Sequence, residues 1–126
     1  VMELEAMHRL KTGALIEASV TLGALSAAPE GDIRHDALQH YASCIGLAFQ
    51  VHDDVLDVTG STGTLGKTGG ADAARGKPTY TSLLGVDGAC EKARALTREA
   101  TQALQPFGEQ ADMLRRIASY ITHRVH

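Results

Sequence analysis

The chain has 126 residues, a formal net charge of -3 and a hydrophobic content of 44%, with no tryptophan. One domain typically has about 100–200 residues, so residues 1–126 are expected to belong to a single domain. No lysine and arginine cluster forms the basic stripe that a nucleic-acid partner needs, and no apolar run reaches the roughly 20 residues of a membrane span. There is no secretory signal, and Cys44 and Cys90 lack a metal-binding spacing, so we expect a cytoplasmic protein with both cysteines reduced and buried.

The N-terminal half of the chain predicts two long helices, because apolar residues recur there at helical spacing. The first helix is predicted over 3–27, and Pro29 lies in the break that follows it. The second helix is predicted over 33–58, and Asp32 is placed to cap its first turn.

The C-terminal half begins with a glycine- and threonine-rich segment, 59–76, which predicts a loop. Pro78 opens a short predicted helix over 78–84, and longer helices are predicted over 87–104 and 110–124. No strand alternation, internal repeat or domain linker interrupts this pattern. The expected fold class is therefore all-α.

Three carboxylates and a glutamine lie in the last turns of the second predicted helix. Gln50, Asp53 and Asp57 are spaced by three and four residues, so they share one face, and Asp54 flanks them. Like charges at this spacing cost roughly 0.2–0.5 kcal/mol per pair, and the C-terminal end of a helix is already negative. No lysine or arginine in the same turns offsets them. A chance acidic helix end is the plain alternative, but Mg²⁺, which takes oxygen ligands, would remove the conflict.

The glycine-rich segment and its basic residues indicate a phosphate-binding site. Lys67 and Lys77 lie in and just after this segment, with Asp72 between them. Glycine-rich backbone can bring N–H groups close to phosphate oxygens, and lysines add point charges. A flexible connector is the alternative, although a loop of this length in a small domain is more often functional or disordered than idle.

Lys11 lies on the first predicted helix and is followed by Thr12 and Gly13. A lysine in such a place is commonly a surface residue. Glycine inside a helix costs roughly 1 kcal/mol against alanine, so Gly13 needs a packing reason, such as close approach by the second helix or a ligand. Together with the carboxylates, Lys11 and Thr12 predict one site for a metal-bound diphosphate.

Three segments in this order resemble the signature of the trans-prenyl diphosphate synthase family. Segment 8–16, HRLKTGALI, is similar to the family's lysine-threonine motif, and segment 46–58, GLAFQVHDDVLDV, is similar to its second aspartate-rich motif. Segment 65–80 resembles the loop that closes on the diphosphate. The similarity extends over nearly the whole chain and is strongest to bacterial enzymes that make farnesyl diphosphate. It implies the C-terminal helices of the isoprenoid synthase fold, which are antiparallel around a deep cavity and usually part of a homodimer.

The resemblance implies roles for the acidic and basic residues. Asp53 and Asp57 would help to hold one Mg²⁺ on the allylic diphosphate, with Asp54 in support. Lys11 and Lys67 would contact the same diphosphate.

The resemblance also implies how the remaining polar residues take part. Lys77 and Asp72 would complete a lid, and Thr12 and Gln50 would point oxygen atoms at the allylic carbocation. The family's reaction ionises the allylic diphosphate, and the double bond of isopentenyl diphosphate then attacks before a proton is lost. The metal and the lysines would stabilise the negative charge that builds on the leaving diphosphate. A dry helical cavity would keep water away from the carbocation. Segment 59–76 is expected to be weakly ordered until Mg²⁺ and diphosphate bind.

Two departures from the family pattern limit what is expected of this chain. Position 52 is His52 where close relatives often have glutamine, which is expected to change local hydrogen bonding and leave the chelate intact. The family's first aspartate-rich motif and the basic residues that bind isopentenyl diphosphate lie upstream, so the isolated chain is expected to be inactive.

Two other functions are alternatives to a piece of a prenyltransferase. One is a non-catalytic diphosphate-binding or regulatory subunit that partners a full synthase. The other is an all-α terpene cyclase, which the lysine-threonine motif and the Lys67 to Lys77 segment disfavour. Helices with uncovered Leu/Ala faces should favour a homo-oligomer or partial disorder.

Overall fold

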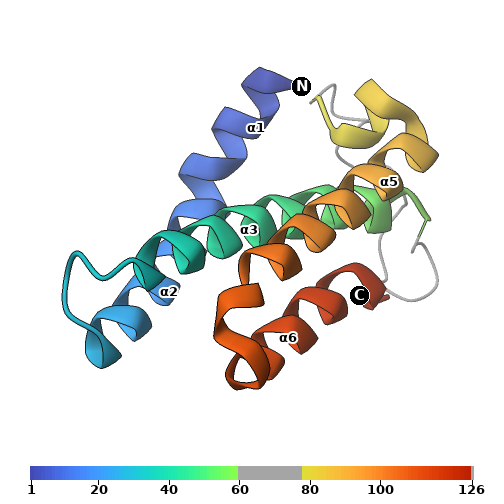
Figure 1. Ribbon diagram of the computed structural model, residues 1–126. Coiled ribbons are helices and arrows are strands. Elements are labelled where there is room, and N and C mark those ends of the chain that lie inside the picture. Colours follow the sequence, from blue (N-terminus) through green and yellow to red (C-terminus); the bar gives the residue numbers. More distant parts are fainter. Residues whose placement is uncertain (60–77, 126) are drawn as a thin grey trace.

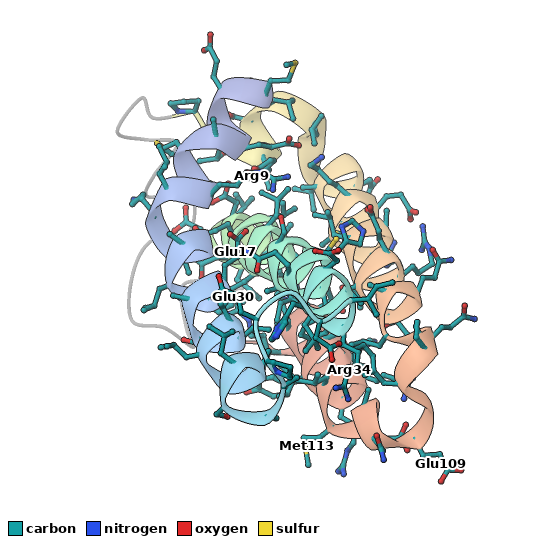
Figure 2. The ribbon with its side chains drawn as sticks, turned by 60° about the vertical axis from the view of Figure 1, so that its left-hand side comes forward. Arg9, Glu17, Glu30, Arg34, Glu109 and Met113 are labelled. Carbon is teal, nitrogen blue, oxygen red and sulfur yellow. The ribbon has the colours of Figure 1, made fainter. Side chains whose placement is uncertain are left out.

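The computed structural model describes residues 1–59 and 78–125, and every regular element within these two ranges is helical. Figure 1 shows α3 (Arg34–Thr59) running through the middle of the molecule. Turned by 60°, Figure 2 shows the N-terminal helical unit on one side of α3 and α5 (Tyr80–Ala103) on the other. The all-α prediction is therefore confirmed. Lys67, Asp72, Lys77 and all of the predicted loop 59–76 except Thr59 lie outside the described residues, and Thr59 itself ends α3.

The N-terminal helical unit consists of α1 (Met2–His8), the π-helical turn η1 (Arg9–Gly13) and α2 (Ala14–Ala27) without a break. The prediction of one helix over 3–27 is confirmed, although its π-helical turn was not predicted. Such single turns inside α-helices occur often at functional sites. The unit ends where Ala28 becomes extended (φ -142°, ψ 145°), because the proline that follows disfavours helical geometry in the residue before it.

The central helix α3 begins at a capping aspartate, as the sequence predicts. Asp32 Oδ1 accepts the backbone N–H of Arg34 at 2.9 Å, and Asp32 Oδ2 pairs with the Arg34 guanidinium at 2.8 Å. These hydrogen bonds hold the pKa of the Asp32 carboxyl well below its usual range. The predicted helix over 33–58 differs from α3 by one residue at each end.

The two helices predicted over 78–84 and 87–104 form the single bent helix α5. The bend lies at Gly85, whose φ of 75° and ψ of 167° are open to glycine and rare for other residues. Beyond α5, the 3₁₀ turn η2 (Gln105–Ala111) leads into α6 (Asp112–His123). The last helix therefore lies within the predicted range of 110–124.

The core lies along α3 as two clusters of buried side chains. The first joins α3 to α5 and α6 and consists of Tyr41, Cys44, Ile45, Ala48, Ala100, Leu104, Ala111, Ala118 and Ile121. The second joins α3 to α1 and the first half of α5 and consists of Leu4, Leu47, Val51, Val55, Tyr80, Ala89 and Ala93. Tyr41 also donates its buried hydroxyl to the backbone carbonyl of Leu114 at 2.7 Å, which ties α3 to α6.

The outer face of α2 is apolar and exposed. Leu15 and Leu22 are each 70% exposed, and none of the residues of α2 is buried. The uncovered apolar face that the sequence predicts is therefore present, while the homo-oligomer inferred from it stays a prediction. Among the described helices, none combines the length and the apolar character that crossing a membrane requires.

Candidate active site

The N-terminal unit and α3 approach each other most closely at two glycines. A Cβ atom on Gly46 would lie 3.2 Å from the Cα atom of Gly13, inside the usual carbon–carbon separation of about 3.5–4.0 Å. The second helix therefore approaches the Gly13 backbone, as one of the two expected reasons requires, but an added Cβ at Gly13 itself would lie 3.2 Å from the His8 carbonyl oxygen of its own unit. The side chain is excluded at Gly46 by the other helix and at Gly13 by the π-helical turn. Lys11 lies two residues before Gly13, and Gln50 lies one helical turn after Gly46, so both residues are close to this crossing.

A pocket with a volume of about 400 Å³ opens beside this crossing, between the N-terminal unit, α3 and the start of α5. It is lined by Met7, His8, Lys11, Gln50, Asp53, Asp54, Pro78 and Thr79. Four of the predicted site residues therefore come together at one hollow, which has the size of a small-molecule site. Thr12 is half-buried and is not one of the lining residues.

The three aspartates have different surroundings. The Asp53 side chain is 58% exposed and lines the pocket. Asp54 is 8% exposed, and its Oδ2 accepts the backbone N–H of Tyr80 at 2.8 Å. Asp57 is 9% exposed and is not one of the lining residues of the pocket. The motif thus divides into one carboxylate open to a ligand, one shared between the pocket and α5, and one buried in α3.

The start of α5 is fixed against this cluster by its own cap. Thr79 Oγ1 accepts the backbone N–H of Ser82 at 3.0 Å, and Ser82 Oγ accepts that of Thr79 at 2.9 Å. This is a capping box, which satisfies two N–H groups that a helix start otherwise leaves without partners. Asp54 satisfies a third, at Tyr80, where the positive end of the helix dipole favours a carboxylate. The geometry of the Thr79 wall therefore depends on Asp54.

Arg124, beyond the end of α6, is a cation near the acidic cluster that the sequence analysis missed. Its Nη2 lies 3.9 Å from Asp53 Oδ1, and its guanidinium lies 4.3 Å from the centre of the Phe49 ring. His52 holds this segment in place, because its Nε2 donates to the Arg124 carbonyl oxygen at 2.9 Å. His52 and Arg124 are 72 positions apart in the sequence, so no local pattern indicates this contact. A cation from the segment after α6 thus offsets part of the repulsion among the aspartates. A pair at this distance and exposure contributes only about 0–1 kcal/mol.

His8 forms an inner wall of the pocket and was given no role of its own from sequence. Its ring centre lies 5.4 Å from that of Tyr80, and both residues are buried. Within the described part of the chain, His8 Nδ1 and the Tyr80 hydroxyl are buried without a hydrogen-bond partner. Burial and then the Lys11 ammonium lower the pKa of His8 below its ordinary 6.5, while the Asp53 carboxylate opposes them. The imidazole is therefore neutral at pH 7 and turns an uncharged face to the pocket.

The donor set of the pocket fits a hydrated magnesium ion with a diphosphate. Asp53 and Gln50 offer carboxylate and amide oxygens, and Mg²⁺ is usually held by one or two carboxylates together with substrate phosphates and waters. The exposed Lys11 side chain lines the same pocket from the N-terminal unit and offers a point charge to phosphate oxygens.

A second hollow of about 370 Å³ lies between α2 and the start of α3 and is less suited to an anion. Its described lining includes the acidic residues Glu30, Asp32 and Asp36 and contains no lysine or arginine. A diphosphate would meet repulsion there, so the Lys11 pocket is the better candidate.

Comparison with known proteins assigns the family. The family model described as polyprenyl synthetase matches residues 1–121. The chain belongs to the polyprenyl synthetase family. The farnesyl diphosphate synthase of Escherichia coli (strain K12) is 52% identical over 124 residues, covering 96% of this chain and 42% of that protein. The chloroplastic geranylgeranyl pyrophosphate synthase of Catharanthus roseus is 48% identical over 122 residues, covering 96% of this chain and 34% of that protein.

Solved structures confirm the fold of this polyprenyl synthetase chain. The apo structure of an FPP/GFPP synthase from Zymomonas mobilis superposes with a TM-score of 0.72 at 38% identity, covering 94% of this chain and 37% of that chain. A structure from Marinomonas sp. MED121 gives a TM-score of 0.78 at 39% identity, covering 97% and 40% respectively. The resemblance that the sequence motifs indicate is thus confirmed, and the chain spans less than half the length of each of these relatives.

Proposed function

We propose that the chain supplies the second aspartate-rich Mg²⁺–diphosphate site of a prenyltransferase similar to farnesyl diphosphate synthase. That enzyme would condense an allylic diphosphate with isopentenyl diphosphate. The observation that carries the proposal is the pocket in which Lys11, Gln50 and Asp53 meet from two helices. A cation and a carboxylate in the lining of one pocket complement a metal-bound diphosphate, which presents anionic oxygens and a divalent ion together. Membership of the polyprenyl synthetase family supports the reaction class.

Each residue of the proposed site has a task that follows from its position. Bound Mg²⁺ would supply electrostatic stabilisation of the charge on the leaving diphosphate. Asp53 is the most accessible carboxylate for the ion, and Asp54 and Asp57 complete the proposed ligand group. Lys11 would donate hydrogen bonds to phosphate oxygens.

The remaining predicted residues would face the hydrocarbon part of the substrate or close over its diphosphate. Gln50 lines the pocket, so its amide oxygen would face the allylic cation, with Thr12 beside it on the N-terminal unit. Lys67, Asp72 and Lys77 would close over the diphosphate. The exposed apolar face of α2 supports a homo-oligomer, and we place the protein in the cytoplasm.

Isothermal titration calorimetry with Mg²⁺ and a non-hydrolysable allylic diphosphate analogue tests the proposal directly. We expect Asp53→Asn and Lys11→Gln each to weaken binding of the analogue at least about tenfold, because each removes one charge from the pocket. Asp36→Asn is the matched control, since Asp36 is an exposed aspartate at the other end of α3. If the parent chain does not bind the analogue, or if Asp53→Asn binds it as tightly as Asp36→Asn does, the assignment of this pocket is wrong.

The alternative is a diphosphate-binding or regulatory subunit that partners a full synthase, and the same pocket would serve it. Farnesyl or geranyl diphosphate formed from isopentenyl diphosphate by the chain alone would exclude this alternative. Binding of the analogue without product, together with a changed rate of an added full-length synthase, would support it.

A further inference from the structure

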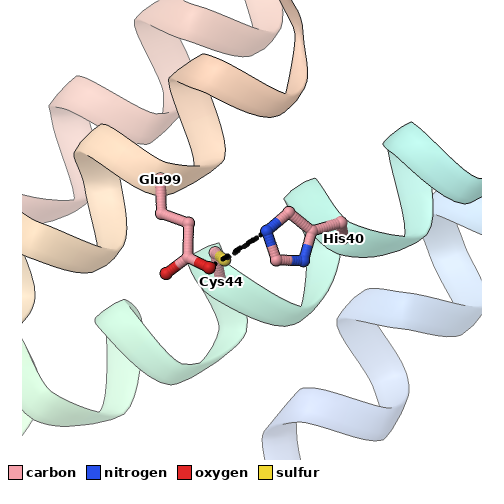
Figure 3. Close-up of side chains that lie close together, drawn as sticks. All are labelled: His40, Cys44 and Glu99. Carbon is pink, nitrogen blue, oxygen red and sulfur yellow. Dashed lines mark hydrogen bonds and ion pairs between the residues drawn. The ribbon is translucent and has the colours of Figure 1, made fainter.

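A cluster of three potential metal ligands lies between α3 and α5, away from the diphosphate pocket. His40 and Cys44 are four residues apart on α3 and therefore share one face, and Glu99 reaches them from α5 (Figure 3). His40 Nε2 lies 3.1 Å from Glu99 Oε1 and 3.9 Å from Cys44 Sγ. All three ligand atoms lie within 4.8 Å of one another. The cluster is thus preorganised by two packed helices and needs no change in the backbone.

These separations match the edges of a tetrahedral zinc site. With Zn–N and Zn–O bonds of about 2.0–2.1 Å and a Zn–S bond of about 2.3 Å, tetrahedral angles place N and O about 3.3 Å apart and N and S about 3.6 Å apart. The two observed separations, 3.1 Å and 3.9 Å, differ from these values by only a few tenths of an ångström. The remaining edge closes by rotation of the half-exposed Glu99 side chain.

We infer that His40, Cys44 and Glu99 bind a thiophilic divalent metal ion of the Zn²⁺ class, with a water molecule as the fourth ligand. Imidazole nitrogen, thiolate sulfur and carboxylate oxygen together suit Zn²⁺, whereas Mg²⁺ takes oxygen ligands only. On binding, the metal–sulfur bond forms as the S–H bond breaks, and the proton passes to solvent. The side chains of His40 and Glu99 are each 52% exposed, so solvent reaches the fourth position.

The cluster lies apart from the diphosphate pocket along α3. Nine residues of α3 separate Cys44 from Asp53, which corresponds to about 14 Å along the helix axis. The cluster and the diphosphate pocket are therefore independent, and failure of one does not decide the other.

Co²⁺ is the probe for the test, because a thiolate–Co²⁺ bond gives a charge-transfer absorption in the near ultraviolet that oxygen ligands do not give. The chain is titrated with Co²⁺ in excess Mg²⁺, so that the carboxylates of the diphosphate pocket do not compete. We expect one Co²⁺ per chain, a band abolished by Cys44→Ser and retained by Cys90→Ser, which removes the other free cysteine. A band that survives Cys44→Ser, or no band at millimolar Co²⁺, would overturn the proposal.

Surface variants keep the test decisive if the buried serine variant does not fold. His40→Gln and Glu99→Gln replace exposed side chains, and each is expected to weaken Co²⁺ and Zn²⁺ binding at least about tenfold. Glu91→Gln, at another exposed glutamate of α5, is the matched control and should bind like the parent. Zn²⁺ should also raise the Tm of the parent and of Glu91→Gln, and should not raise that of His40→Gln. The reason is that the ion binds α3 and α5 together only in the folded chain. Equal metal affinity in all three variants would exclude this cluster.

Discussion

The close crossing of Gly46 and Gly13 predicts how much stability one added side chain removes. In Gly46→Val, the new Cβ would lie 3.2 Å from the Cα of Gly13 and 3.8 Å from Cδ1 of Ile16, before the two further methyl groups are added. The nearest atom belongs to the backbone of another helix, so it cannot rotate away. Overpacking of this kind typically costs about 1–3 kcal/mol. Valine is only about 0.3 kcal/mol better than glycine in a helix interior, so the gain in propensity does not offset the clash.

We therefore expect Gly46→Val to lower the free energy of unfolding by about 1–3 kcal/mol. Gly46→Ala should lie near zero, since alanine recovers about 1 kcal/mol of helix propensity against a smaller clash. The matched control is Gly23→Val in α2, where an added Cβ meets nothing within 4 Å. An exposed substitution without such a contact should change stability by no more than about 0.5 kcal/mol.

Urea denaturation followed by far-ultraviolet circular dichroism measures these three variants against the parent. The midpoints should shift without a change in the m-value, because the clash alters stability and leaves the area exposed on unfolding unchanged. A wider crossing would also separate Lys11 from Gln50, so Gly46→Val should bind the diphosphate analogue less tightly. If Gly46→Val is as stable as Gly23→Val, the close approach of the two helices is not the reason for glycine at position 46.

Three further predictions concern polar contacts of buried or half-buried groups. Tyr41→Phe removes the 2.7 Å hydrogen bond to the Leu114 carbonyl and should cost about 0.5–1.5 kcal/mol in the same denaturation assay, and no loss would mean that water replaces this bond. Lys92 Nζ lies 2.6 Å from Glu5 Oε1, so the exchanged pair Lys92→Glu with Glu5→Lys should recover most of the stability that either single change removes. His8 has a lowered pKa, so below pH 6.5 the unfolded chain binds a proton that the folded chain does not. The free energy of unfolding should therefore fall from pH 7 to pH 5 and fall less in His8→Gln, whereas parallel curves would contradict a neutral buried imidazole.

The helices could be predicted from sequence because their signals are local. Periodic apolar residues, the aspartate that caps α3 and the proline after α2 all act within a few residues. The break predicted between the helices 78–84 and 87–104 corresponds to the bend of α5 at Gly85, which adopts a positive φ. The π-helical turn Arg9–Gly13 was not predicted, because its apolar spacing departs too little from that of an ordinary helix turn.

The candidate site could be predicted only where its residues lie in a motif. Spacing along α3 predicted one face with Gln50, Asp53 and Asp57 and with Asp54 beside it, and the pocket is lined by Gln50, Asp53 and Asp54 but not by Asp57. The lysine-threonine motif added Lys11, which lines the same pocket. Arg124 could not be found in this way, because a chain separation of more than 70 residues is closed only by the packing of α6 against α3. Burial of the neutral His8 imidazole likewise depends on Tyr80, which α5 supplies.

The aspartate motif therefore has a structural as well as a proposed chemical meaning. Sequence spacing treats its carboxylates as equivalent, and the helix-end repulsion among them argues for a cation. In the fold, Asp54 gives one oxygen to the Tyr80 N–H, and a hydrogen bond to a charged group contributes about 1.5–3 kcal/mol. The pocket and the start of α5 consequently share the Asp54 carboxylate. The exposed Asp53 carboxylate, in contrast, has Arg124 as its ion-pair partner in the described part of the chain. A ligand that binds Asp54 would compete with the hydrogen bond to Tyr80 and so loosen the start of α5. A ligand that binds Asp53 would leave this hydrogen bond in place.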